Sequence, residues 1–134
     1  MNKILLIDDD KRTVSALIED LVETYKFQVT CLTNADEVLL ELNEVKYDAI
    51  ILDVMMPVPV SWTINEKSEA ALGLATGVVL YKKIRKIFST IPILILSARE
   101  FIDIKSDKFS LYIRKPESIA GIVKNINKLL KNEQ

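Results

Sequence analysis

Histidine is missing from this 134-residue chain, and cysteine occurs only once. Without histidine the chain can form neither a Ser-His-Asp triad nor a histidine zinc site, and no imidazole can act as a general base. The single cysteine, Cys31, lies in an apolar segment that predicts a strand. We therefore interpret Cys31 as a small buried side chain in a reducing cytoplasm rather than as a reactive thiol.

Long apolar runs and an excess of charge are missing as well. The longest apolar runs have the length of a strand, and three aspartates interrupt the first one, so neither a signal peptide nor a membrane span is predicted. The net charge of −1 does not favour binding to nucleic acid or to an anionic membrane. With 49% hydrophobic residues, the chain is expected to form one globular cytoplasmic domain with a sizeable core.

What the chain does contain is a set of short apolar runs, each followed directly by polar or charged residues. Lys3–Ile7 precedes Asp8, Asp9 and Asp10; Ala49–Leu52 precedes Asp53; Ile91–Leu96 precedes Ser97; and Leu111–Arg114 precedes Lys115. Runs this apolar are typical of strands buried on both faces of a parallel sheet. Because the carboxyl ends of such strands share one sheet edge, where ligands bind, the acids, the hydroxyl and the amine are predicted to meet there.

Between these runs, apolar residues recur at helical spacing. Helices are predicted at Lys11–Tyr25, after an N-cap at Asn34, at Gly77–Phe88 and at Ser118–Leu130, with a further strand at Phe27–Leu32. The stretch from Arg99 to Lys108 has only a weak helical pattern. Strands that alternate with helices indicate right-handed βαβ units, and hence an α/β fold with a doubly wound five-stranded parallel sheet covered by helices on both faces.

Over nearly its whole length, the chain resembles the receiver domain of bacterial response regulators. The resemblance rests on the acidic cluster after the first strand, the phrase Asp53-Val54-Met55-Met56-Pro57 after the third, Ser97-Ala98 after the fourth and Lys115-Pro116 after the fifth. It implies a flavodoxin-like sheet with strand order 2-1-3-4-5. It also implies a function as the phosphoacceptor of a two-component phosphorelay, and not as an enzyme.

The resemblance assigns a role to each residue of these motifs. Asp53 would be the phosphoacceptor; Asp8, Asp9, Asp53 and the backbone carbonyl of Met55 would hold Mg²⁺; Ser97 and Lys115 would bind the phosphoryl oxygens; and Ser97 and Tyr112 would form the switch. Pro116 is the candidate for a cis peptide bond, which would turn the lysine toward the site. The implied partners are a histidine kinase or histidine phosphotransfer protein, and a downstream protein that the sequence does not identify.

Elementary chemistry agrees with these roles. Three acids at one sheet edge repel one another, so at least one of them should have a raised pKa unless a cation is present. Mg²⁺ removes this conflict, because it prefers oxygen ligands and shares its coordination sphere with phosphate. An aspartate carboxylate can act as a nucleophile and form an acyl phosphate, while Lys115 offers a compact positive charge to a phosphate oxygen.

Three other interpretations stay open at this point. Any of Asp8, Asp9 and Asp10 could be a helix N-cap or a first-turn acid, and Asp10 is expected to be only that. A hydrolase of the haloacid dehalogenase type also uses an aspartate bound to Mg²⁺. It needs a second acid two residues later as its proton shuttle, however, and this chain has Met55 there. The third possibility is a receiver-like interaction module that is not phosphorylated.

Two segments depart from the family pattern. An enlarged loop after the third strand, residues 58–76, separates Pro57 from Gly77 and contains the sole tryptophan, Trp62. It can be interpreted as a lid or binding loop, or as a tolerated surface insertion. The segment between Ser97 and Lys115 is shorter than the corresponding segment of the family by about one helical turn. The fourth helix of the family is therefore predicted to be shortened or missing, which leaves its usual output surface in question.

From these observations we expect a single receiver domain over residues 1–134, with no output domain. Such a domain would signal through contacts with another protein, or would serve as a sink for phosphoryl groups. The sequence identifies neither the kinase nor the target.

Overall fold

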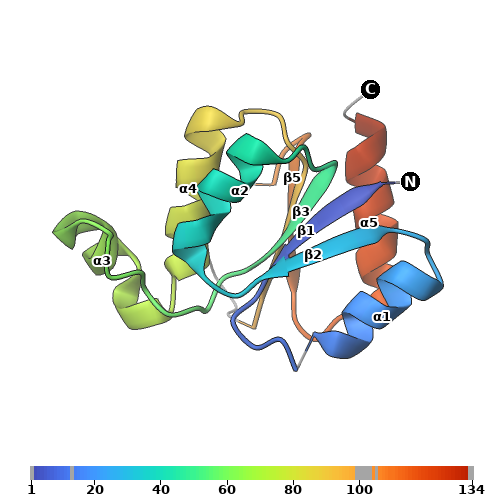
Figure 1. Ribbon diagram of the computed structural model, residues 1–134, viewed down its shortest axis with the longest axis horizontal. Helices are drawn as coiled ribbons and strands as arrows, with labels where there is room; N and C mark the ends of the chain where they lie inside the picture. The colour runs from blue at the N-terminus through green and yellow to red at the C-terminus, as the bar shows by residue number, and fades with distance from the viewer. Residues whose placement is uncertain (1, 13, 99–103, 105, 133–134) are drawn as a thin grey trace.

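A five-stranded parallel sheet forms the centre of the molecule (Figure 1). The computed structural model describes residues 2–12, 14–98, 104 and 106–132. The strands are β1 (Lys3–Ile7), β2 (Gln28–Leu32), β3 (Ala49–Asp53), β4 (Ile93–Ser97) and β5 (Ser110–Arg114), in the spatial order β2-β1-β3-β4-β5. The doubly wound sheet that the sequence predicts is thereby confirmed, with the strand order that the family resemblance implies.

Helices cover both faces of the sheet (Figure 1). Helices α1 (Ser15–Glu23) and α5 (Ile119–Asn132) pack on one face, and α2 (Val38–Glu44) and α4 (Thr76–Ile87) pack on the other. Successive strand residues point to opposite faces. Ile4 and Leu6 of β1 therefore lie in the core beneath α1 and α5, while Leu5 and Ile7 lie in the core beneath α2 and α4. This division explains why the strand sequences are almost continuously apolar.

Two of the predicted helix starts are wrong. The first helix begins at Ser15 with Val14 as its N-cap, so Asp10 lies outside it. Asp10 is not a helix cap, because its carboxylate accepts the backbone N–H of Arg12 at 3.1 Å and closes a local turn instead. Asn34 makes no side-chain capping bond either; it precedes a 3₁₀ turn, Ala35–Glu37, and α2 follows from Val38.

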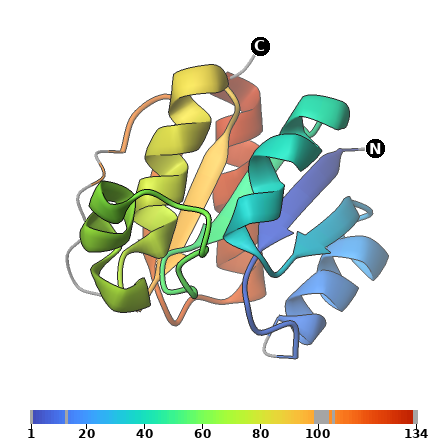
Figure 2. The same cartoon turned by 60° about the vertical axis from the view of Figure 1, so that its left-hand side comes forward.

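The enlarged loop after β3 is folded, and its residues 58–75 are called the arm below. The arm contains helix α3 (Ile64–Glu69) and a 3₁₀ turn (Ala71–Gly73) (Figure 2). A capping box starts α3: the Thr63 hydroxyl accepts the Glu66 N–H at 3.1 Å, and the Glu66 carboxylate accepts the Thr63 N–H at 2.8 Å. The Thr-x-x-Glu spacing is the sequence signal for this helix.

The predicted shortening of the helix before β5 falls largely on residues 99–103 and 105, which lie outside the described residues. In the described part of the segment between Ser97 and Ser110 there is no helix. No helix in the described ranges is long and apolar enough to cross a bilayer.

Candidate functional site

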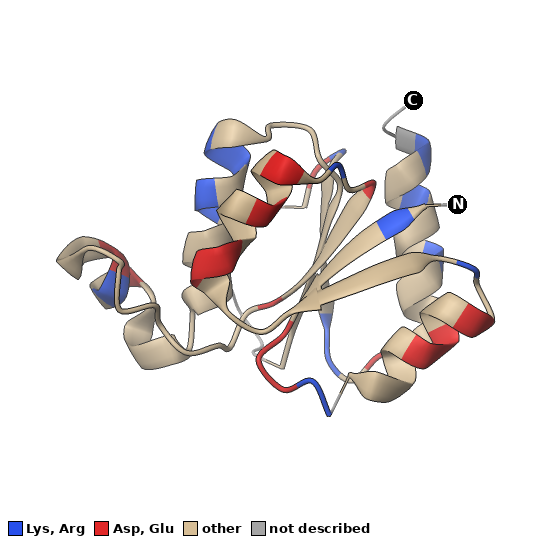
Figure 3. Ribbon diagram, viewed as in Figure 1, with Lys and Arg blue, Asp and Glu red and all other residues tan. Residues whose placement is uncertain are grey.

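Four strand ends bring the polar residues that the sequence singles out to one edge of the sheet. Asp8 directly follows β1, Asp53 ends β3, Ser97 ends β4, and Lys115 directly follows β5. Because the strands are parallel and in register, with Asp53 beside Leu96 on β4, these ends align. Figure 3 shows the acidic residues after β1 and at the end of β3 at this edge, as expected from the sequence.

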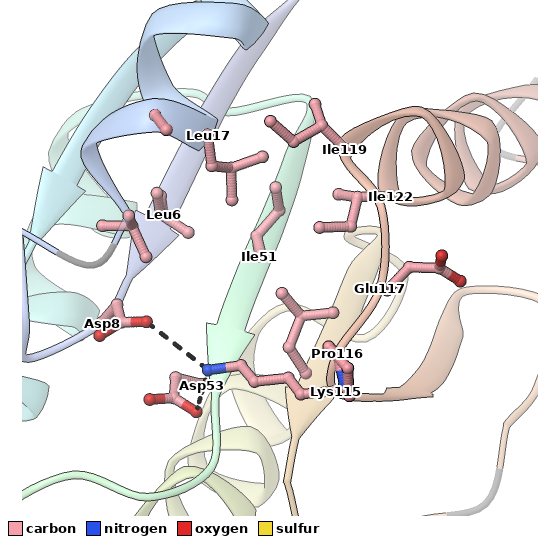
Figure 4. A pocket seen from close by; sticks show the side chains of 13 residues that line it. Leu6, Asp8, Leu17, Ile51, Asp53, Lys115, Pro116, Glu117, Ile119 and Ile122 are labelled. Carbon is pink, nitrogen blue, oxygen red and sulfur yellow. Dashed lines mark hydrogen bonds and ion pairs between the residues drawn. The ribbon is translucent and has the colours of Figure 1, made fainter.

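The three carboxylates of this edge are close enough to share one ion. Asp8, Asp9 and Asp53 each have a carboxylate oxygen, and these oxygens all lie within 4.8 Å of one another. Lys115 is their cationic neighbour: its Nζ lies 3.3 Å from Asp53 Oδ1 and 3.9 Å from Asp8 Oδ2 (Figure 4). A cluster of oxygen ligands that is only partly neutralised by one ammonium group fits a hard divalent cation such as Mg²⁺.

Burial makes this arrangement electrostatically unfavourable without a further cation. Asp53 is 9% exposed and Asp8 is 4% exposed. Burial is the main cause of the raised pKa of Asp53, against the opposing charge and hydrogen bond of Lys115. Burial likewise raises the pKa of Asp8, helped by the negative charge of Asp53 and opposed chiefly by the Asp10 N–H. The site is therefore built to hold more positive charge than Lys115 supplies.

Local backbone contacts hold the two buried acids in place. The Asp8 carboxylate accepts the N–H of Asp10 at 2.9 Å, which fixes its orientation at the end of β1. The N–H groups of Val54 and Met55 lie near the Asp53 carboxylate and lower its pKa, although burial has the larger effect. The Val54 N–H donates to the Leu96 carbonyl at 3.2 Å. Met55, two residues after Asp53, is 41% exposed. The metal-binding role of its backbone carbonyl stays a prediction.

The remaining predicted residues surround this cluster. Ser97 is fully buried, and its carbonyl accepts the backbone N–H of Lys115 at 2.8 Å, which joins the ends of β4 and β5. Tyr112 is half-buried on β5 beside Ile95, and it packs against the core beneath α2 and α4. The peptide bond between Lys115 and Pro116 is cis, as predicted from the sequence.

A cavity of about 370 Å³ opens next to the acids, between the first turns of α1 and α5 (Figure 4). Asp8, Asp53 and Lys115 lie at its polar end. Its other walls are mainly apolar and comprise Leu6, Val14, Ala16, Leu17, Ile51, Leu96, Pro116, Glu117, Ile119 and Ile122. The site thus combines a charged end with an apolar wall, an arrangement suited to a polar reacting group carried by a larger molecule.

Two residues that support the site are absent from the sequence-based prediction. A Cβ on Gly77 would lie 2.3 Å from the Asp53 carbonyl oxygen, so only glycine lets α4 approach the end of β3 this closely. Thr76 is fully buried, and its hydroxyl donates to the Met56 carbonyl at 2.6 Å. A glycine at the start of a predicted helix was a readable signal for a close approach, whereas nothing local in the sequence indicates the bond made by Thr76.

Comparison with known proteins gives a consistent result. No protein-family model matches the chain. The transcriptional regulatory protein CiaR of Streptococcus pneumoniae is 30% identical over 138 residues, covering 98% of this chain and 52% of the regulator. PrrA of Mycobacterium leprae is 26% identical, covering 96% of this chain and 50% of the regulator. The chain therefore spans about half the length of these two curated relatives.

Solved structures match the chain from end to end. A Francisella response regulator receiver domain superposes with a TM-score of 0.72 at 28% identity and covers 100% of both chains. The response regulator TrrA of Thermotoga maritima, solved with Mg²⁺ and a beryllium fluoride, has a TM-score of 0.73 at 24% identity. The match covers 96% of this chain and 99% of TrrA, and at this identity it shows a shared fold alone. Sheet order, the full-length structural match and the relatives together show that the chain belongs to the response regulator receiver domains.

Proposed function

We propose that this receiver domain accepts a phosphoryl group on Asp53 with the help of Mg²⁺ and passes the signal on through protein contacts. The observation that carries the proposal is the cluster of Asp8, Asp9 and Asp53, whose carboxylate oxygens lie within 4.8 Å of one another beside Lys115. Three carboxylates and one ammonium leave an excess of negative charge that a divalent cation would balance.

In the proposed reaction, Asp53 is the nucleophile. One of its carboxylate oxygens forms a bond to the phosphorus of the donor, while the bond between phosphorus and the donor breaks and its electron pair stays with the donor. Bound Mg²⁺ would neutralise charge on the phosphoryl oxygens, with Asp8, Asp9 and Asp53 as its protein ligands. The Asp53 carboxylate must be ionised to react, and Lys115, 3.3 Å away, favours that form.

Lys115 and Ser97 would hold the phosphoryl group after transfer. Lys115 Nζ reaches both buried acids, so it is placed to pair with the charge that the modification adds at Asp53. Ser97, at the end of the neighbouring strand, would contribute a hydroxyl donor, and Tyr112 would respond to its movement. We do not assign the chain the activity of a haloacid dehalogenase-type phosphatase, because the position two residues after Asp53 is occupied by Met55.

The proposed donor is a histidine kinase or a histidine phosphotransfer protein. TrrA, which shares the fold at 24% identity and a TM-score of 0.72, was solved in complex with the histidine kinase ThkA. That complex supports the same class of partner for this chain, whose polar cluster opens into a cavity with apolar walls. The downstream partner is proposed to be a protein.

Incubation with acetyl phosphate, followed by intact-mass measurement, tests the proposal. The wild-type protein should gain one phosphoryl group with Mg²⁺ and none with excess EDTA. Asp9→Asn should require much more Mg²⁺ for the same gain, because it removes one carboxylate of the cluster. Asp10→Asn is the matched control, since the Asp10 carboxylate bonds the Arg12 N–H outside the cluster. Equal magnesium dependence in both variants would show that the metal site is misplaced.

A further inference from the structure

The arm, residues 58–75, is bonded to the backbone that directly follows Asp53. The Met56 N–H donates to the Gly73 carbonyl at 3.1 Å, and the Thr76 hydroxyl donates to the Met56 carbonyl at 2.6 Å. The Gly77 N–H donates to the Val54 carbonyl at 2.8 Å. The residues that would move first when Asp53 is modified are therefore tied to the end of the arm and to the start of α4.

A change at Asp53 has a direct route into this backbone. Val54 and Met55 directly follow Asp53, and their N–H groups lie near its carboxylate and lower its pKa. Formation of an acyl phosphate turns one carboxylate oxygen into the bridge to phosphorus, so these N–H groups face a different acceptor with more negative charge around it. The two residues must then readjust, and Met56 follows them in the chain.

Different contacts hold the far part of the arm, namely ion pairs at its surface and the buried ring of Trp62. Lys83 of α4 pairs with Glu66 at 2.7 Å and lies 4.9 Å from the centre of the Trp62 ring, and Lys82 pairs with Glu69 at 2.8 Å. Partly exposed ion pairs of this kind hold an element only loosely. Trp62, by contrast, is 6% exposed and packs into the core that includes residues of α4. The ring therefore reports on whether the arm stays packed against this core.

Between the two sets of contacts lies a strained turn. Ala71, Leu72 and Gly73 have φ angles of 51°, 57° and 97°, so three consecutive residues lie in the left-handed region. Only the glycine adopts this conformation without strain. Leu72 is fully exposed, so no packing of its side chain requires the conformation. Strain of this kind persists because the contacts on either side impose it, and it is relieved when one side moves.

We propose that the arm is a conformational element coupled to Asp53, and that modification of Asp53 shifts the arm through the bond between Thr76 and Met56. This inference rests on the proposed phosphoacceptor function. The arm turns on the strained residues 71–73, while α4 beyond Thr76 and the sheet keep their positions. The coupling assigns a role to the segment in which this chain departs most from the family pattern.

Trp62 fluorescence and hydrogen exchange of residues 58–75 test the coupling. Both should change when Mg²⁺ and beryllofluoride are added to the wild-type protein, and neither should change in Asp53→Asn. Thr76→Val keeps the side-chain shape but removes the hydroxyl, and it should lose at least half of the fluorescence change while gaining the same phosphoryl mass as the wild type. Thr76→Ser should restore the response. Thr63→Ala is the control, because it removes the α3 cap but leaves the bond to Met56.

The outcomes separate this inference from the proposed function. A wild-type protein that gains the phosphoryl mass without a change in fluorescence or exchange of the arm overturns the coupling alone. A full response in Thr76→Val overturns the route through Thr76. A wild-type protein that takes no phosphoryl group overturns the proposed function and, with it, the coupling. The exchange measurement on the wild type decides the matter even if Thr76→Val does not fold.

Discussion

Replacing Gly77 by alanine tests how closely α4 is seated against the end of β3. The added Cβ would lie 2.3 Å from the Asp53 carbonyl oxygen and 2.5 Å from Val54 Cα. Both neighbours are backbone atoms, so no side-chain rotation can relieve the contact. The helix would have to retreat by about 1 Å to reach ordinary van der Waals distances. The retreat would also stretch the hydrogen bond from the Gly77 N–H to the Val54 carbonyl, now 2.8 Å long.

The expected loss of stability follows from three opposing contributions. Alanine is preferred to glycine within a helix by about 1 kcal/mol, which favours the variant. Overpacking a closely packed contact costs about 1–3 kcal/mol, and a weakened buried hydrogen bond costs about 1 kcal/mol. The net effect for Gly77→Ala is a loss of about 2 kcal/mol, equivalent to a fall in Tm of roughly 6–10 °C for a domain of this size.

Gly121→Ala provides the matched control within α5. Its Cβ would lie 2.5 Å from the Glu117 carboxyl carbon, but Glu117 is exposed and its side chain can rotate away. Helix preference then dominates, and the variant should be up to about 1 kcal/mol more stable than the wild type. Urea unfolding of the three proteins without Mg²⁺ measures both effects. Equal stability of the two variants, or a Gly77→Ala protein more stable than the wild type, would refute the reasoning.

Four further predictions concern the charges of the molecule. Asp53→Asn should be more stable than the wild type at pH 7 without Mg²⁺, because burial raises the pKa of Asp53. In urea unfolding, this difference in stability should narrow as pH falls through the raised pKa of the folded wild type toward the ordinary value of 3.8. Magnesium at about 100 times its Kd should raise the free energy of unfolding of the wild type by about 2.7 kcal/mol, and that of Asp53→Asn much less. If thermal unfolding shows the same stabilisation of both proteins, Asp53 is not a ligand of the metal. Lys115→Met should bind Mg²⁺ about three- to tenfold more tightly in calorimetric titration, since the ammonium no longer competes for the acids; weaker binding would contradict this. Arg85→Met should cost about 2–4 kcal/mol in urea unfolding, because Arg85 donates to three backbone carbonyls and to Ser110, while Lys86→Met on the exposed side should stay within about 0.5 kcal/mol.

Most of the sheet and the composition of the site could be predicted from local sequence patterns. An apolar run that ends in Asp53 marks a strand buried on both faces, and the strand observed is Ala49–Asp53, with every residue buried. The same pattern placed Asp8 and Lys115 at strand ends, and parallel pairing alone then brings them together. These features are readable because each depends on burial along a single short segment.

The arm and the helix starts could not be predicted in the same way. Trp62 and Ala70 of the arm are buried against residues that lie far away in the sequence, and no local pattern indicates such partners. The left-handed conformation of Leu72 is likewise imposed by its surroundings, since leucine has no preference for it. Asn34 and Asp10 are good capping residues by type, but nearby backbone groups and a 3₁₀ turn compete for the same role.

Mapping the position of the phosphoryl group tests the central claim most directly. Wild-type protein labelled by acetyl phosphate with Mg²⁺ would be treated with hydroxylamine, which converts an acyl phosphate into a stable hydroxamate, and then digested and sequenced by tandem mass spectrometry. We predict a single modified position at Asp53, absent from Asp53→Ala and retained in Asp10→Asn. Label on Ser97 that resists hydroxylamine, or modification that survives Asp53→Ala, would contradict the assignment of Asp53 as the phosphoacceptor.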